Sequence, residues 1–104
     1  ERLPTAIVCN RDETAFRFVK ELRMKGLQVP EDISVVGFDD SVYAQLCDPP
    51  LTTVSVDVDE IGRMAVKSLL KHMEHPEQKG GEVFRVPGRI IYRNSVKKIG
   101  WKGF

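Results

Sequence analysis

Residues 29–40 read V-P-E-D-I-S-V-V-G-F-D-D, and this stretch decides how the rest of the chain is interpreted. A turn containing Pro30 leads into an apolar run, which ends abruptly before two adjacent carboxylates. Continuous β-branched runs are typical of strands that are buried on both faces of a parallel sheet. In open α/β sheets, ligands bind beyond the carboxyl ends of such strands. The sequence therefore predicts part of a small-molecule site at Asp39 and Asp40.

The size and charge of the chain limit what it can be. Its 104 residues are enough for one small domain or for a piece of a larger one. The 16 basic residues nearly balance the 15 acidic ones, which argues against a free-standing nucleic-acid-binding module. No apolar run approaches the roughly 20 residues needed to span a bilayer, so no membrane partner is expected. The chain begins at Glu1 rather than Met, and a missing signal peptide therefore carries little weight.

The two cysteines, Cys9 and Cys47, stand alone in the sequence. Neither lies in a CxxC pair or at a spacing typical of metal ligands. Two buried, reduced thiols in a cytoplasmic protein are the simplest interpretation. No metal ligands and no cofactor are predicted, because the chain also lacks a GxGxxG motif and a phosphate-binding loop.

The first half of the chain has the pattern of one strand–helix–strand unit. Residues 5–9 predict a short buried strand, and residues 33–38 predict the next one. Between them an amphipathic helix is expected, with Asp12 as its N-cap and Gly26 at its C-terminal end. Strands joined in this way are parallel and neighbouring in the sheet.

The second half begins with an extended, β-branched segment at residues 51–56. Asp57 then opens the strongest predicted helix, in which Asp57 and Glu60 have the spacing of a capping box. One face of this helix is apolar and comprises Val58, Ile61, Ala65, Val66, Leu69, Leu70 and Met73. Two short strands are predicted at residues 82–86 and 89–93.

The candidate ligand-binding residues are Asp39 and Arg11. A carboxylate at a strand end accepts strong hydrogen bonds from sugar hydroxyls or ring N–H groups, although both acids could instead cap the next turn. Arg11 follows the first strand and occupies the equivalent edge, where it offers planar donors to hydroxyls, carboxylates or phosphates. The alternative for Arg11 is a solvated surface side chain. No catalytic residue is predicted, because Ser41 has no identifiable base.

Five segments together resemble the effector-binding domain of the lac/gal repressor family. They are P-T-A-I-V-C-N-R-D-E-T-A at 4–15, G-L-Q-V-P-E-D-I-S-V-V-G-F-D-D at 26–40, P-P-L-T-T-V at 49–54, I-G-R-M-A-V-K-S-L-L at 61–70 and I-I-Y-R-N-S at 90–95. Their order and spacing fit the family from residue 4 to about residue 95. The style of the loop and tail also resembles arabinose-type repressors.

The resemblance implies an α/β fold of the periplasmic-binding-protein type I, in which three crossing strands join two lobes and the effector binds between them. The chain would supply about the last third of that domain. Residues 1–51 would belong to the C-terminal lobe, and residues 52–80 to a crossing segment and a helix of the N-terminal lobe. Residues 81–96 would form return strands, and residues 97–104 a tail. A piece of this kind is expected to form a smaller rearranged core or to use a second copy to cover exposed strand edges.

The function implied by the resemblance is ligand sensing by a bacterial transcriptional repressor, without enzymatic activity. The expected partners are a small-molecule effector of the sugar class, a second copy of the protein, and DNA through an N-terminal domain that this chain does not contain. In this family the aspartate of the G-F-D motif, here Asp39, commonly contacts the effector. The residue before the first-helix aspartate also contributes, usually as asparagine. Arg11 at that position favours a more anionic or differently oriented effector.

Family dimers pair through the first helix and the segment after G-F-D, so Phe16, Tyr43 and Cys47 would face a partner, although core packing explains Phe16 equally well. Two other functions remain open from the sequence. One is an exported periplasmic sugar-binding protein that serves a transporter. The other is a small α/β enzyme that uses Asp39 or Asp40 as an acid or nucleophile.

Overall fold

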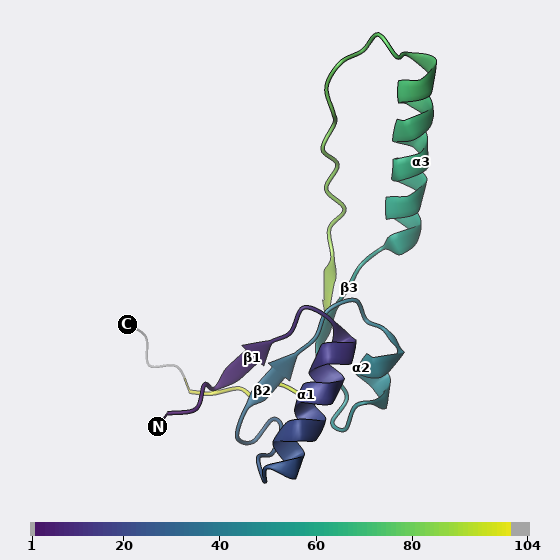
Figure 1. The fold of residues 1–104 in the computed structure, drawn as a ribbon. Coiled ribbons are helices and arrows are strands. Elements are labelled where there is room, and N and C mark those ends of the chain that lie inside the picture. The colour runs from purple at the N-terminus through teal and green to yellow at the C-terminus, as the bar shows by residue number, and fades with distance from the viewer. Residues whose placement is uncertain (1, 101–104) are drawn as a thin grey trace. The chain divides into compact units, whose positions relative to one another are not determined.

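The computed structural model describes residues 2–100 and divides the chain into two compact units (Figure 1). The first unit contains the residues up to Ser55 and those from Arg89 onward, and the second unit is Val56–Gly88. The predicted tail at residues 97–104 lies within the described part only as far as residue 100. None of the described helices has the length and apolar character that a membrane span needs.

The first unit is built on a parallel strand pair. Strands β1 (Ala6–Val8) and β2 (Ser34–Val36) pair in parallel with Ile7 opposite Val35, and helix α1 (Asp12–Met24) connects them. The predicted strand–helix–strand unit is therefore confirmed. The predicted burial of the first strand is wrong, because Ala6 and Val8 are exposed and Ile7 is only half-buried. Gly26 follows the C-cap of α1 with a φ of +81°, the left-handed conformation that glycine adopts most readily, which agrees with its predicted place at the helix end.

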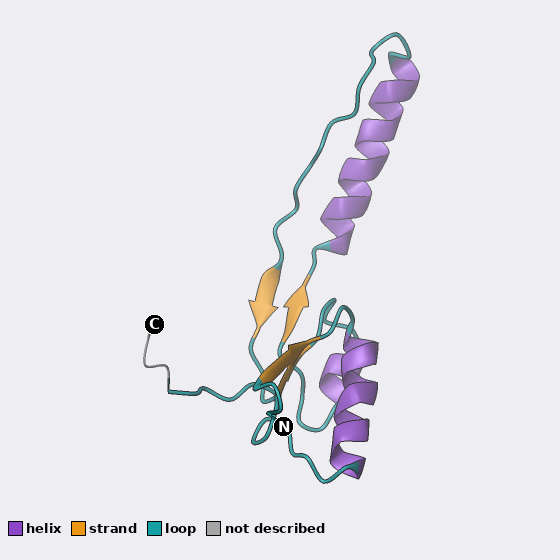
Figure 2. Cartoon of the chain, turned by 60° about the vertical axis from the view of Figure 1, so that its left-hand side comes forward, coloured by secondary structure: helices purple, strands orange, loops and turns teal. Residues whose placement is uncertain are grey.

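Strand β3 (Thr53–Ser55) continues the sheet beyond β2. Two single parallel bridges, Val36 with Thr52 and Asp39 with Ser55, connect β2 and the segment after it to β3 and its preceding residue. Strand β4 (Arg89–Ile91) then pairs with β3 in the antiparallel direction, with Ile90 opposite Val54 (Figure 2). The predicted strands at residues 51–56 and 89–93 are thus present, each shorter than predicted.

Helices α1 and α2 (Val42–Leu46) lie side by side against this sheet and close its core (Figures 1 and 2). Helix α1 contributes residues at helical spacing, which places them on one face. Both cysteines are buried and free, as predicted. The buried apolar residues are Cys9, Ala15, Val19, Leu22, Ile33, Val35, Ala44, Cys47 and Leu51.

The predicted role of Asp12 as the N-cap of α1 is wrong. Arg11 holds the N-cap position in an extended conformation, and its side chain makes no capping hydrogen bond. Asp12 is the first residue of the helix and is only 1% exposed. Its carboxylate points inward because a backbone N–H and a hydroxyl group of the neighbouring segments donate to it, and those tertiary contacts replace the local cap.

The second unit contains helix α3 (Val58–Glu74) and the chain that follows it. The predicted start of this helix is confirmed, because Asp57 Oδ1 accepts a hydrogen bond of 3.0 Å from the N–H of Glu60. The Glu60 side chain pairs with Arg63 instead of returning to the Asp57 N–H, so only half of a capping box forms. No residue of α3 is buried, and its apolar face remains exposed.

The predicted strand at residues 82–86 is wrong. The segment has no strand pairing in the structure, and Val83 is 85% exposed. A strand needs a neighbour to accept its backbone hydrogen bonds. The unit Val56–Gly88 contains no such strand among its described residues.

Candidate functional site

The loops that follow β1 and β2 meet at one edge of the sheet, as the parallel arrangement requires. The backbone N–H of Asp12 donates a hydrogen bond of 3.0 Å to the carbonyl oxygen of Phe38. Arg11 and Asp39 are the sequence neighbours of these two residues, so the structure brings together the backbones of both predicted ligand-binding residues. Both side chains are exposed. No hydrogen bond or ion pair joins them to each other in the part of the chain that the structure describes.

Asp39 and Asp40 both have left-handed backbones, with φ values of 99° and 53°. Aspartate is among the non-glycine residues that tolerate this region best. Helix α2 begins after Ser41, and no side chain caps it. The alternative that the two acids cap the next turn is therefore wrong. Asp40 has another partner, whereas the Asp39 carboxylate has none among residues 2–100.

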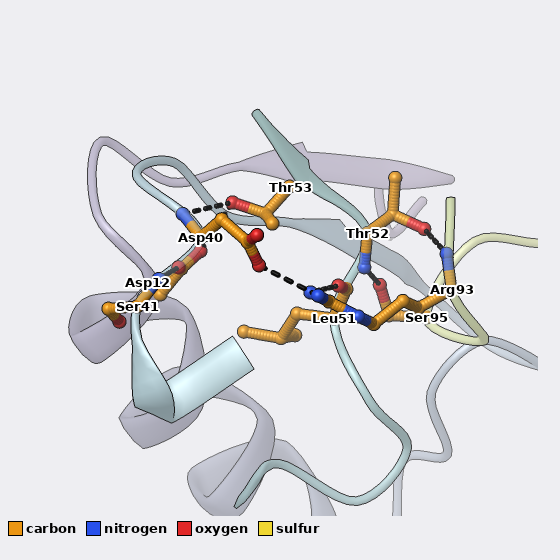
Figure 3. Close-up of polar contacts among 8 residues, drawn as sticks. All are labelled: Asp12, Asp40, Ser41, Leu51, Thr52, Thr53, Arg93 and Ser95. Atoms are coloured by element: carbon orange, nitrogen blue, oxygen red, sulfur yellow. Dashed lines mark hydrogen bonds and ion pairs between the residues drawn. The ribbon is translucent and has the colours of Figure 1, made fainter. Parts of the chain in front are cut away.

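The partner of Asp40 is Arg93, which lies just beyond the end of β4 (Figure 3). Arg93 Nη2 donates to Asp40 Oδ1 at 2.7 Å, and the two side chains are only 18% and 24% exposed. Arg93 Nη1 also donates to the Leu51 carbonyl oxygen at 3.1 Å. One guanidinium group thus joins three segments of the first unit. Sequence reasoning missed this role, because only the family pattern I-I-Y-R-N-S singled out the segment.

Asp12 is the second anchor of the loop that carries Asp39. Its carboxylate accepts hydrogen bonds of 2.6 Å from the Thr53 hydroxyl and 2.6 Å from the Ser41 N–H (Figure 3). Gly37 passes directly beside it, and a Cβ atom at that position would lie 3.2 Å from the Cα atom of Asp12. The same Cβ atom would overlap the Asp12 carboxylate oxygen Oδ1, which explains the glycine of the G-F-D segment.

A polar network beneath the site joins β2, β3 and the segment after β4. The Thr52 N–H donates to Ser95 Oγ at 2.8 Å, and the Ser95 hydroxyl donates to the Val35 carbonyl oxygen at 2.5 Å. The Arg93 N–H donates to Thr52 Oγ1 at 2.9 Å. Every buried side-chain nitrogen and oxygen of the described residues has a hydrogen-bond partner. Fully satisfied polar networks are rigid, so this network stabilises the edge of the sheet that carries Asp39.

The two thiols are poor nucleophiles in this environment. Burial raises the pKa of Cys9, and it also raises the pKa of Cys47 against smaller opposing contributions from the Asp48 backbone and from Arg23. A raised pKa keeps a thiol protonated at neutral pH, and the thiol is much less reactive than the thiolate. Cys47 is buried in the core, so the expectation that it faces a partner protein is wrong. Phe16 packs against the core and against the Tyr43 ring, with 5.5 Å between ring centroids.

The side chains at this edge offer hydrogen-bond donors and acceptors. Residues 2–100 contain no group of three or more His, Cys, Asp or Glu side chains arranged to hold a metal ion. Asp39 offers an unpaired acceptor, and Arg11 offers planar donors. A hollow of about 440 Å³ lies between the end of α1 and residues 27–31, but these residues precede β2 and so lie at the opposite end of the strands from Asp39.

Known proteins share the sequence of this chain over most of its length. The HTH-type transcriptional repressor PurR of Vibrio campbellii is 37% identical over 99 residues, which cover 95% of this chain and 29% of that protein. The arabinose metabolism transcriptional repressor of Geobacillus stearothermophilus is 40% identical over 95% of this chain and 27% of its own length. The HTH-type transcriptional repressor CytR of Escherichia coli is 45% identical over 92% of this chain and 28% of its own length. The chain thus spans less than a third of each of these relatives.

Solved structures share the fold at similar coverage. A LacI transcriptional regulator from Bacillus cereus superposes with a TM-score of 0.84 at 29% identity, over 93% of this chain and 34% of that one. The cellobiose complex of the regulator CelR gives a TM-score of 0.79 at 28% identity, over 88% of this chain and 28% of that one. A glucose-bound CcpA regulator from Weissella paramesenteroides gives 0.75 at 31% identity, over 91% and 33%.

The parallel strands, their connecting helix and the acidic loop after β2 define an α/β domain of the periplasmic-binding-protein class, as predicted. The profile of the periplasmic binding protein-like domain family matches residues 1–96, and the chain belongs to this family. Within it, the chain corresponds to part of the effector-binding domain of lac/gal-type repressors, which confirms the resemblance. The relatives do not separate the arabinose type from other types, because PurR and CytR match to a similar degree.

Proposed function

We propose that this chain is part of the ligand-sensing domain of a bacterial transcriptional repressor that binds a small-molecule effector of the sugar class. The observation that carries the proposal is the match to three repressors over at least 92% of the chain. The glucose and cellobiose complexes of two structural relatives support the sugar class. The protein acts without catalysing a reaction, in the cytoplasm where its DNA lies.

Asp39 and Arg11 are the residues that contact the effector in this proposal. Both are exposed at the edge where ligands of open α/β sheets bind. The Asp39 carboxylate accepts hydrogen bonds from effector hydroxyls, and the Arg11 guanidinium donates to hydroxyls or to an anionic group. The Asp40 carboxylate does not contact the ligand in this proposal, because it is already paired with the Arg93 guanidinium.

The proposed mechanism is a shift between two populations. The effector binds between two lobes and makes different contacts in their open and closed arrangements. Binding therefore moves a homodimer between a form that holds DNA through a separate N-terminal domain and a form that does not. The coupling is reciprocal, so operator DNA changes the affinity for the effector by the same factor.

The first experiment screens L-arabinose, D-glucose, cellobiose and D-glucose 6-phosphate for a rise in the melting temperature of the intact protein that carries this chain. A ligand that binds only the folded state stabilises it, and calorimetry with the best sugar then gives its dissociation constant. Asp39→Asn should weaken that binding roughly 10- to 100-fold, since hydrogen bonds to a charged group contribute about 1.5–3 kcal/mol. Asp59→Asn, at an exposed position of α3, is the matched control and should leave the affinity unchanged.

The same variant distinguishes the other functions. In a repressor, Asp39→Asn retains operator binding in a gel-shift assay but no longer responds to the sugar. A transporter's binding protein would show no operator binding at all, and loss of substrate turnover in the variant would indicate an enzyme. Either of these last two results would contradict the proposal.

A further inference from the structure

The loop that carries Asp39 has a backbone conformation that requires support from outside the loop. Two consecutive non-glycine residues, Asp39 and Asp40, have positive φ values. Such conformations are sparsely populated in isolated chains and persist where surrounding contacts hold them. The Asp39 N–H donates to the Val54 carbonyl oxygen at 2.9 Å, but a single backbone hydrogen bond leaves the next residue free to turn.

The Ser41 N–H is held by the Asp12 carboxylate, and Arg93 supplies the side-chain contact to Asp40 itself. Its charge-assisted hydrogen bond to the Asp40 carboxylate is 2.7 Å long and largely shielded from solvent. The Asp40 N–H makes only a long contact of 3.4 Å with the Thr53 hydroxyl, so the carboxylate carries most of the restraint on this residue. Partly buried ion pairs are screened less by salt than exposed ones, which favours a persistent contact.

Arg93 is itself held in place. Its N–H donates to Thr52 Oγ1 at 2.9 Å, and its second guanidinium nitrogen donates to the Leu51 carbonyl oxygen at 3.1 Å. Arg93 lies on the segment after β4, and these two hydrogen bonds hold it beside β3. Its guanidinium group reaches Asp40 from there (Figure 3). Two of its five N–H donors are thus engaged by Leu51 and Asp40, and the side chain is only 18% exposed, which suits Arg93 to orient the loop.

We infer that Arg93 is a positioning residue that acts through Asp40 to present the Asp39 carboxylate to the effector. The inference rests on the proposed function, in which Asp39 contacts the effector. Asp39 is the exposed neighbour of the residue that Arg93 fixes and has no side-chain partner among residues 2–100, so a loss of the Arg93–Asp40 contact frees the loop without removing the ligand-binding carboxylate. The planar guanidinium holds its donors in a rigid fork that spans two acceptors, whereas the donors of lysine radiate from a single nitrogen.

Hydrogen exchange on the intact protein tests the positional part without any effector. Arg93→Gln should raise the exchange rate of the amides at residues 39–41 at least about tenfold, while those of α1 and β1 keep their rates. Asp40→Asn should give the same local change, and the double variant should add nothing further because both changes break one contact. Arg93→Lys should be intermediate. A uniform rise over the whole unit, or no rise at residues 39–41, would overturn the inference even if no sugar binds.

Calorimetry tests the functional part, with D-glucose, cellobiose or L-arabinose as the probe, whichever raises the melting temperature most. Arg93→Gln should weaken binding by about tenfold in the unaltered protein, which corresponds to about 1.4 kcal/mol. It should have no further effect in a protein that already carries Asp39→Asn, because it acts through Asp39. An equal loss in both backgrounds would mean that Arg93 acts elsewhere, and the inference would be wrong.

The two proposals fail in distinguishable ways. If Asp39→Asn weakens sugar binding and Arg93→Gln does not, the ligand role of Asp39 stands and only the positioning role of Arg93 is wrong. If Asp39→Asn leaves the affinity unchanged, the proposed ligand contact itself is wrong, and the inference that depends on it is overturned as well.

Discussion

Asp12 shows how a single buried carboxylate can be tolerated at the edge of a small sheet. Two donors, the Ser41 N–H and the Thr53 hydroxyl, lie 2.6 Å from its oxygens. Burial of an unpaired carboxylate here would destabilise the fold strongly, whereas burial of a carboxylate that accepts two strong hydrogen bonds does not. The Ser41 bond holds the loop after β2 against the start of α1, and the Thr53 bond holds β3 there, so Asp12 is a structural residue of the candidate site rather than a cap.

Replacement of Asp12 should therefore be strongly destabilising. Asp12→Ala leaves one partly buried N–H and one buried hydroxyl without an acceptor, and we expect the free energy of unfolding to fall by about 3 kcal/mol in urea denaturation. Glu21→Ala, at an exposed position of the same helix, should change it by less than about 0.5 kcal/mol. A similar small change for both variants would show that the Asp12 contacts contribute little.

At this scale the sequence predicts exposed residues better than buried partners. The edge position of Asp39 and Arg11 follows from where two strands end, which is a local pattern. The assignment of Asp12 as a cap failed because an aspartate before a helix looks the same whether it caps or turns inward. The Arg93–Asp40 pair spans 53 positions of sequence, and nothing local to either residue indicates the other.

The space around a glycine differs between the loop after β2 and helix α3. Gly37 follows β2 and lies against Asp12, whereas Gly62 lies in α3, where a Cβ atom would have nothing within 4 Å of it. A methyl group at the first position, Gly37, must displace the Asp12 oxygen Oδ1, which accepts a hydrogen bond from the Thr53 hydroxyl. At the second position it meets only solvent and removes the flexibility that glycine gives to a helix.

The two alanine substitutions should consequently have opposite signs. Gly37→Ala is expected to lower the free energy of unfolding by about 1–3 kcal/mol through overpacking. Gly62→Ala should increase the stability of α3 by about 0.5–1 kcal/mol and raise the helical signal in circular dichroism. Thermal and urea unfolding of the two variants measure both effects, and a stabilising Gly37→Ala would contradict the close approach.

A second prediction concerns the ion pair between α3 and the segment after it. Lys71 Nζ donates to Glu82 Oε1 at 3.0 Å, and this hydrogen bond, together with the lysine charge, lowers the pKa of Glu82. A lowered pKa in the folded state means that the contact is present above the ordinary pKa of glutamate and is lost as the pH falls through the lowered value. Lys71→Gln should therefore raise the Glu82 pKa toward the ordinary value in a carboxyl-carbon NMR titration, and an unchanged Glu82 pKa would contradict the contact.

The strand predicted at residues 82–86 illustrates why element type is not settled by local sequence. Its composition favours an extended backbone, but a strand exists only where another strand accepts its hydrogen bonds. Helix α3 gives the complementary lesson. Its N-cap and apolar periodicity predicted the helix correctly, but no residue of its apolar face is buried in the structure.

The whole molecule divides into a unit with a buried core and a unit without one. All nine buried apolar residues of the core belong to the first unit. Helix α3 has no buried residue, and apolar side chains such as those of Val58 and Leu69 are 71% and 59% exposed. Local stability follows buried contacts, so the two units should open with very different free energies.

Limited proteolysis of residues 1–104 alone should reveal this difference. Trypsin is expected to cleave after Lys79 and Arg85 well before it cleaves within α1, because the unit Val56–Gly88 opens readily. Mass spectrometry of the early products identifies the sites, and Arg17 and Lys20 of α1 serve as internal controls with exposed side chains. Equal early cleavage in both units would show that α1 is no better protected than α3.

The long separation between Asp40 and Arg93 has a consequence for the order of events during translation. The ribosome adds about 5–20 residues per second, so the 53 positions between the two side chains take roughly 3–10 s to synthesise. Throughout that interval the nascent strand pair and α1 can already associate, while the acidic loop lacks its arginine. Completion of the binding edge is therefore one of the last steps for this part of the chain. A translational pause before residue 93 prolongs the time during which the loop lacks its contact with Arg93.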